Sequence, residues 1–155
     1  DVVCTVTGTV GGGAFSGRGQ RGRSWGDPDW ERMTLARTLS AWFDDGGAIS
    51  LVAVRPAKAS SHADEAVTAL LLDGEEVRPV GEPRLSTTYD AEERQRAAGL
   101  ELYLDAEDGA AIRAAGEVVA GTTLDLGRLR LDCAFFRWRS QGRSGVGRYD
   151  VLRRV

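Results

Sequence analysis

Short stretches of alternating apolar and polar residues follow one another along most of the chain. In residues 2–10, Val2, Cys4, Val6 and Val10 share one face, while three threonines and Val3 share the other. This alternation predicts a half-buried strand. Turn sequences such as 44–47 and 73–74 favour hairpins between neighbouring strands. Further strands are predicted at residues 14–19, 34–43, 48–54, 66–72, 76–80, 84–88, 100–104, 110–119, 129–138 and 145–155.

Two strands break the simple alternation. Arg37 interrupts an otherwise apolar face in residues 34–43, so we expect it to be paired or to lie at a wet end of a barrel. In residues 129–138 the apolar positions change from odd numbers, ending at Phe135, to even numbers, beginning at Phe136. An extra residue at a β-bulge produces such a change, so we predict a bulge there.

About ten short strands joined by tight turns, without a convincing helix, are typical of an all-β sandwich or barrel. Hairpin connections predict an antiparallel meander, and such a meander closes or folds over to protect its edges. The chain has 155 residues, a length that suits a single domain over residues 1–155. A barrel of about eight strands has room for side chains or for one small ligand.

Composition narrows the classes of function. The net charge is −3, which argues against a general nucleic-acid binder, and the arginines at 128–154 alternate with apolar residues as on a wet strand face. No apolar run is long enough to cross a membrane. Cys4, Cys133 and the single His62 do not suit a zinc site. Two distant cysteines are typical of buried thiols in a cytoplasmic protein, although a disulfide between neighbouring strands remains an alternative.

The segment 17–30 differs from every other part of the chain. It combines three arginines, two aspartates and two tryptophans with four glycines and a proline. Arg21 and Arg23 would project to one face of an extended segment, with Asp27 and Asp29 as partners. Trp25 and Trp30 offer ring faces for stacking. We interpret this corner as a polar site that binds ligand oxygens, or as a structural plug at one end of the barrel.

Other chemistry-bearing patterns are weak. The string Gly17–Gly22 fits G-x-G-x-x-G, but it does not open a helix, so a nucleotide site is not predicted and no cofactor is expected. Aromatic residues at strand spacing line a cavity or fill the core. These residues are Trp42, Tyr103, Phe135, Phe136 and Trp138.

The string Gly19–Gly26, followed by Asp29 and Trp30, resembles the Gly-x-Gly-Gln-Arg-Asp-His-Ser-Trp-Gly-x-Arg-Asp-Trp signature of the carotenoid 1,2-hydratase (hydroxyneurosporene synthase) superfamily. Kievitone hydratase-like proteins and fungal Diels–Alderase-like cyclases are relatives. The segments 43–47, 72–77 and 142–150 are similar to later strands and turns of that superfamily.

The resemblance implies a lipocalin-like (calycin) β-barrel of about 8–10 strands, usually present in tandem. This chain would then be the second barrel of a longer protein, with the first barrel as its partner. Enzymes of the superfamily act on hydrophobic isoprenoids, flavonoids or polyketides by water addition or cyclisation, without an obvious cofactor.

Carried over residue by residue, the resemblance implies an apolar ligand with acid-assisted hydration, isomerisation or cyclisation. Asp29 or Asp150 would supply the proton. The expected ligand contacts that match the signature are Gln20, Arg21, Ser24, Trp25 and Trp30. The residues themselves, and not the resemblance, add Arg23 of the polar corner and the aromatic residues Trp42 and Tyr103.

The chain departs from the signature at the positions that suggest proton transfer. Gly22 and Arg23 replace its Asp and His, and Pro28 replaces its second Arg. Two hypotheses therefore stay open. The first is a barrel that binds a hydrophobic small molecule, and the second is a non-catalytic barrel that packs on a partner domain.

Overall fold

The computed structural model describes residues 2–23, 25–74, 76–104 and 111–155, and they form an all-β protein. The strands are β1 (Val2–Val10), β2 (Gly13–Arg21), β3 (Met33–Phe43), β4 (Ala48–Pro56), β5 (Ala66–Asp73), β6 (Glu76–Pro79), β7 (Glu82–Tyr89), β8 (Gln95–Tyr103), β9 (Ala111–Asp125), β10 (Leu129–Ser140) and β11 (Arg143–Arg154). Two 3-10 turns, η1 (Trp30–Arg32) and η2 (His62–Asp64), are the helical elements among these residues.

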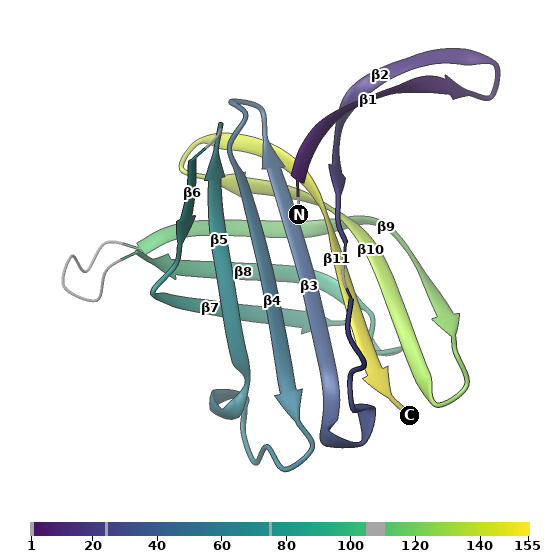
Figure 1. The fold of residues 1–155 in the computed structure, drawn as a ribbon, viewed down its shortest axis with the longest axis vertical. Coiled ribbons are helices and arrows are strands. Elements are labelled where there is room, and N and C mark those ends of the chain that lie inside the picture. The colour runs from purple at the N-terminus through teal and green to yellow at the C-terminus, as the bar shows by residue number, and fades with distance from the viewer. Residues whose placement is uncertain (1, 24, 75, 105–110) are drawn as a thin grey trace.

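Nine of the strands form one antiparallel sheet in the order β6-β5-β4-β3-β11-β10-β9-β8-β7. The sheet is strongly curled, so that β7, β8 and β9 cross behind β3, β4 and β5 (Figure 1). The expected all-β antiparallel fold is confirmed, and the curled sheet is consistent with a lipocalin-like barrel.

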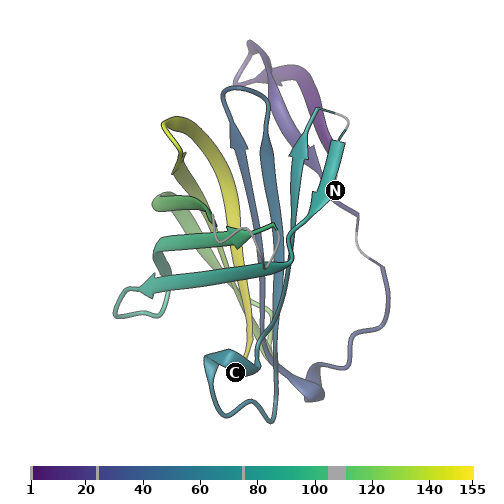
Figure 2. The ribbon, with the colours of Figure 1, turned by 90° about the vertical axis from the view of Figure 1, so that its left-hand side faces the viewer.

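The order of strands explains the curl. From β3 the chain steps outward to β6, whereas from β7 it steps back to β11, which pairs with β3. The two edge strands, β6 and β7, are consecutive in the chain and only Val80 and Gly81 separate them. This short connection holds the two edges of the sheet together at one corner, as the side view shows (Figure 2). The meander therefore folds over, with one seam that has no ladder between β6 and β7.

Aromatic side chains fill the interior of the curled sheet. Trp138, Phe136 and Tyr149 are at most 1% exposed. The ring of Phe136 stacks on Trp138 with 5.6 Å between centroids and meets Tyr149 edge-on at 5.5 Å. Gly116 makes room for this cluster, because a Cβ there would lie 2.7 Å from the Trp138 ring. Phe136 and Trp138 are thus core residues, whereas Phe135 lies on the outer face and is 59% exposed.

The predicted bulge exists, but the extra residue is in the neighbouring strand. Phe135 pairs with Ala120 and Phe136 pairs with Val118, so Val119 of β9 is the extra residue. The buried face of β10 carries even-numbered residues throughout. The expected change of face within β10 is therefore wrong. The odd-numbered apolar residues up to Phe135 belong to the outer face, which the alternation of a single strand cannot distinguish from the inner one.

The β1–β2 hairpin forms a separate two-stranded sheet. It projects from the end of the nine-stranded sheet (Figure 1). Its full register from Val2–Arg21 to Val10–Gly13 matches the predicted pairing of these segments. Within the described part of the chain, a hydrogen bond of 3.5 Å from Arg18 Nη1 to the carbonyl of Phe43 connects it to the larger sheet.

Candidate functional site

The Arg–Trp corner after β2 lies on the surface. Arg21, Arg23 and Trp25 are exposed, and Trp25 is 86% exposed. The Arg23 guanidinium lies 5.9 Å from the centroid of the Trp25 ring. Asp29 is the N-cap of η1, and its Oδ1 accepts a hydrogen bond from the Glu31 amide at 3.1 Å. The corner therefore carries a cation–π contact and a helix cap.

The other predicted site residues are dispersed. Trp30 is half-buried, and its carbonyl accepts a hydrogen bond from Arg154 Nη1 at 3.3 Å. Asp150 lies on the outer face of β11, where it pairs with Arg148. Trp42 is half-buried on the side of β3 opposite its core residues. Tyr103 is half-buried at the end of β8, and Arg84 lies 5.0 Å from its ring centroid.

Two predicted residues cannot be placed fully. Ser24 lies outside the described residues, and the side chain of Gln20 is likewise outside them, although its backbone belongs to β2. Among the residues that are described, no contact joins Asp29 to Asp150 or to Arg21 and Arg23. The structure therefore does not assemble the predicted set into one site.

A different pocket lies where β8 and β9 separate. Its volume is about 320 Å³. Backbone and side chains of 118–122 on β9 and 132–134 on β10 form one wall, while Asp90 and 94–96 form the other. Val118, Val119, Ala120 and Ala134 supply apolar surface. Sequence reasoning missed this pocket because its two walls are distant in the chain.

Two β-bulges flank the pocket. Thr88 pairs with Ala97 and Tyr89 pairs with Gln95, so Arg96 is the extra residue of β8. Val119 is the extra residue of β9, and both residues line the pocket. Bulges bend a strand and redirect side chains, and they are common beside functional sites. The sequence signal that pointed to this region was the change of apolar positions near Phe135 from odd to even numbers, which predicted a bulge.

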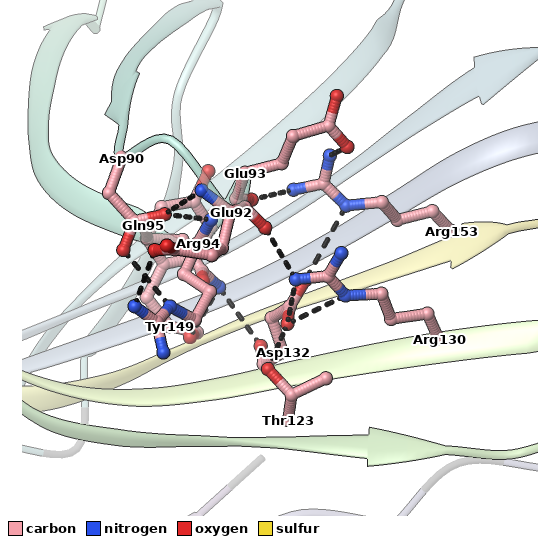
Figure 3. Close-up of polar contacts among 10 residues, drawn as sticks. All are labelled: Asp90, Glu92, Glu93, Arg94, Gln95, Thr123, Arg130, Asp132, Tyr149 and Arg153. Atoms are coloured by element: carbon pink, nitrogen blue, oxygen red, sulfur yellow. Dashed lines mark hydrogen bonds and ion pairs between the residues drawn. The ribbon is translucent and has the colours of Figure 1, made fainter.

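The β10 side of the lining includes a buried carboxylate, that of Asp132, whose polar contacts Figure 3 shows. Asp132 is 1% exposed, and its Oδ1 accepts hydrogen bonds from Thr123 Oγ1 at 2.6 Å and Arg130 Nε at 3.1 Å. Its Oδ2 lies 3.5 Å from Arg153 Nε, within ion-pair range. Neither of these two atoms has a hydrogen-bond partner. Asp132 is thus held by two arginines at the base of the pocket.

The opposite wall is fixed by hydrogen bonds of the turn before β8 (Figure 3). Asp90 accepts hydrogen bonds from the Arg94 amide at 2.8 Å and from Arg94 Nε at 3.0 Å. The backbone hydrogen bond from Arg94 lowers the pKa of Asp90. Gln95 is buried, and its Nε2 donates to the carbonyls of Asp132 at 2.9 Å and Tyr149 at 3.1 Å. Gln95 therefore links the turn before β8 to β10 and β11 through two hydrogen bonds.

A second polar cluster lies inside the sheet. Arg37 is 2% exposed and forms an ion pair with Glu65, whose side chain is also 2% exposed. Arg37 Nη1 donates to Thr87 Oγ1 at 3.1 Å and to the Tyr149 hydroxyl at 3.4 Å. Burial raises the pKa of Tyr149 to about 12. Of the two alternatives expected for Arg37, pairing is confirmed, and its partners make this cluster a cross-link among β3, β7, β11 and the loop that carries Glu65.

A second pocket is a weaker candidate for a functional site, because its charged side chains are already paired. A pocket of about 480 Å³ between β7, β8 and β9 is bordered by Arg84, Glu101 and Arg113, and both arginines pair with Glu101.

Cys4 and Cys133 are free thiols, so the alternative of a disulfide between them is not realised. Across the described ranges, no group of three His, Cys, Asp or Glu side chains is placed to hold a metal ion. No helix in those ranges has the length and apolar character needed to cross a membrane.

The whole chain matches the model of a known protein family. A family model with the description "Domain of unknown function (DUF7064)" matches residues 1–155. No curated protein matches the chain.

Proposed function

We propose that this chain, which belongs to the DUF7064 family, binds a small and mainly apolar molecule in the pocket between β8 and β9. The observation that carries the proposal is the pair of bulges, at Arg96 and Val119, whose extra residues both line this pocket. The proposal keeps the ligand class expected from the resemblance, an isoprenoid or polyketide-like molecule, and moves the site away from the corner 17–30.

The size of the pocket suits such a ligand. A volume of about 320 Å³ lies at the lower end of the range for small-molecule sites, about 300–1,000 Å³. Since a water molecule occupies about 30 Å³ in the liquid, the pocket holds about ten groups of that size. A ten-carbon isoprenoid, or one end of a longer molecule, has matching dimensions.

The interior of the sheet is a poorer candidate. Trp138, Phe136 and Tyr149 are packed there and are almost completely buried. We propose binding rather than catalysis, because Asp29 and Asp150 are absent from the pocket lining.

Titration with geraniol, an uncharged ten-carbon isoprenoid, tests the proposal by calorimetry and native mass spectrometry. We expect Val119→Trp to fill the pocket from its rim and to weaken geraniol binding at least about tenfold. Val146→Trp is the matched control, since Val146 is 59% exposed and Val119 is 61% exposed, but Val146 is not part of the lining. Absence of binding to the wild type, or equal binding to Val119→Trp, would contradict the proposal.

One observation favours the second candidate, a structural barrel that packs on a partner domain with an apolar sheet surface. The face of the β1–β2 hairpin with Val2, Val6, Val10 and Phe15 is exposed, each of them by at least 43%. An isolated two-stranded hairpin is only marginally stable in water, so a covering surface would stabilise it.

Amide hydrogen exchange in dilute solution tests this second candidate. We expect hairpin amides to exchange at nearly unfolded rates when no partner is present. Protection equal to that of β3 would mean that the hairpin needs no cover, and it would remove the argument for a partner.

A further inference from the structure

We propose that the ligand of the β8–β9 pocket carries a carboxylate, and that Arg96 binds this group. The inference rests on the proposed function, which places an apolar molecule in the pocket. It adds the chemical class of the polar end of the molecule and the residue that recognises it.

Arg96 differs from the other arginines of the pocket region in having no side-chain partner among the described residues. Arg94 pairs with Asp90 and Glu92, Arg130 pairs with Asp132, and Arg153 pairs with Asp132 and Glu93. These ion pairs are 2.8–3.5 Å long. Arg96 also lines the pocket, is exposed, and has no ion pair or hydrogen bond to any side chain in the described part of the chain.

The bulge explains why this guanidinium is at the pocket. As the extra residue of β8, Arg96 has no opposite residue on β7, and the ladder between β8 and β9 begins only at Ala97. A bulged residue is freed from the regular alternation of faces and can direct its side chain beside the strand. Arg96 is therefore a cation placed at the rim of an apolar pocket.

The carboxylates nearby are already engaged. Asp90 and Asp132 line the pocket, and each is paired with at least one arginine. Glu92 and Glu93 form ion pairs with Arg94 and Arg153, and their side chains are 64% and 69% exposed. Each of these four carboxylates is thus paired with Arg94, Arg130 or Arg153, and among the described residues none of them is paired with Arg96.

The edge of β9 provides further donors. The ladder between β8 and β9 ends at Ala97–Glu117, whereas β9 remains paired with β10 as far as Asp125. Residues 118–125 therefore have a free edge on the side of β8, and residues 118–122 line the pocket. Alternate N–H groups of such an edge point away from the paired strand. A carboxylate bound to Arg96 would lie near these amide donors. An ammonium group in the same place would be repelled by the guanidinium of Arg96.

The test compares three ligands with the same carbon skeleton: geranate, geraniol and geranylamine. At pH 7 and low salt, we expect the wild type to bind geranate about tenfold more tightly than geraniol, and geranylamine most weakly. Arg96→Gln should remove this preference, so that its affinities for geranate and geraniol agree within about twofold. Arg137→Gln is the control for loss of one positive charge, because Arg137 is exposed and lies outside this pocket.

The outcomes separate the two proposals. Equal affinity of the wild type for geranate and geraniol, or a preference for geranate that survives Arg96→Gln, would overturn the assignment of a carboxylate to Arg96 and leave the apolar site intact. Failure of all three ligands to bind would overturn the proposed function itself.

Discussion

At the scale of single residues, burial decides how much an ion pair contributes to stability. Glu65 and Arg37 are both almost completely buried, and the Glu65 carboxylate is the counter-ion of Arg37. Glu82 and Arg84 form a similar pair at 2.6 Å, but their side chains are 54% and 57% exposed. When one partner of a buried ion pair is removed, the other charge stays buried without compensation. When one partner of an exposed pair is removed, water solvates the remaining charge.

We therefore expect Glu65→Gln to lower the free energy of unfolding by about 3–5 kcal/mol. Glu82→Gln should lower it by less than about 1 kcal/mol. Urea denaturation of the two variants measures the difference. Equal small effects would show that Arg37 finds solvent or another partner when Glu65 is neutral.

Because the pKa of the Tyr149 hydroxyl is raised in the folded protein, we expect the free energy of unfolding to fall at high pH. Burial raises its pKa in the folded protein to about 12, from an ordinary value of 10. The folded state therefore keeps this proton more tightly than the unfolded state, and its contribution is complete below pH 10. It is lost as the pH rises from 10 to 12, by up to about 3 kcal/mol.

Tyr149→Phe removes this titration. We expect the difference in unfolding free energy between the wild type and Tyr149→Phe to favour the wild type at pH 9 and to fall steadily between pH 10 and 12. Urea denaturation at four pH values measures it. A difference that stays constant over this range would contradict the raised pKa of Tyr149.

At the scale of elements, β11 can pack closely on β3 only because residue 147 is a glycine. A Cβ on Gly147 would lie only 1.8 Å from the carbonyl oxygen of Ser40 and 2.8 Å from the Cα of Ala41. Both are backbone atoms of the paired strand, so relief requires the strands to separate. By contrast, a Cβ on Gly8 of the hairpin would meet nothing within 4 Å.

Gly147→Ala should consequently lower the free energy of unfolding by about 3 kcal/mol or more. Gly8→Ala should change it by less than about 1 kcal/mol. Thermal or urea denaturation distinguishes the two variants. A neutral Gly147→Ala would mean that β11 can shift along β3 without loss of packing.

The elements also show where prediction from sequence fails. Strand β9 continues to Asp125, six residues beyond the predicted end at 119. The segment 120–125 includes Gly121 and has exposed side chains, so it lacks the alternation that marks a half-buried strand. Its pairing with β10 supplies the backbone hydrogen bonds that stabilise it, and this is a tertiary contact.

At the scale of the whole molecule, the sheet has one weak seam. The strands β3 and β11 lie in the middle of the sheet order, whereas β6 and β7 are its edges. We expect amides of β3 and β11 to exchange only on global unfolding, and amides of β6 to exchange at least about a hundredfold faster. Amide exchange resolved by NMR measures this ranking. Equal protection of β6 and β3 would indicate that the seam is hydrogen-bonded in solution.

The sequence by itself determined the fold class, the tight turns, the β1–β2 pairing and the presence of a bulge near Phe135. These features depend on alternation and turn chemistry within a few residues, which the chain displays directly. It also singled out Arg37 as a residue that is either paired or at a wet end of a barrel, since a charge on an apolar face is costly unless it is paired.

Only the tertiary structure decided which side of β10 faces inward, which strand holds the extra residue, and where a ligand can fit. The pocket unites Arg96 of β8 with Val119 of β9 and Asp132 of β10. These residues come together because the sheet curls and its strands part at two bulges. The pairing of distant strands determines that geometry, and no pattern within one strand specifies it.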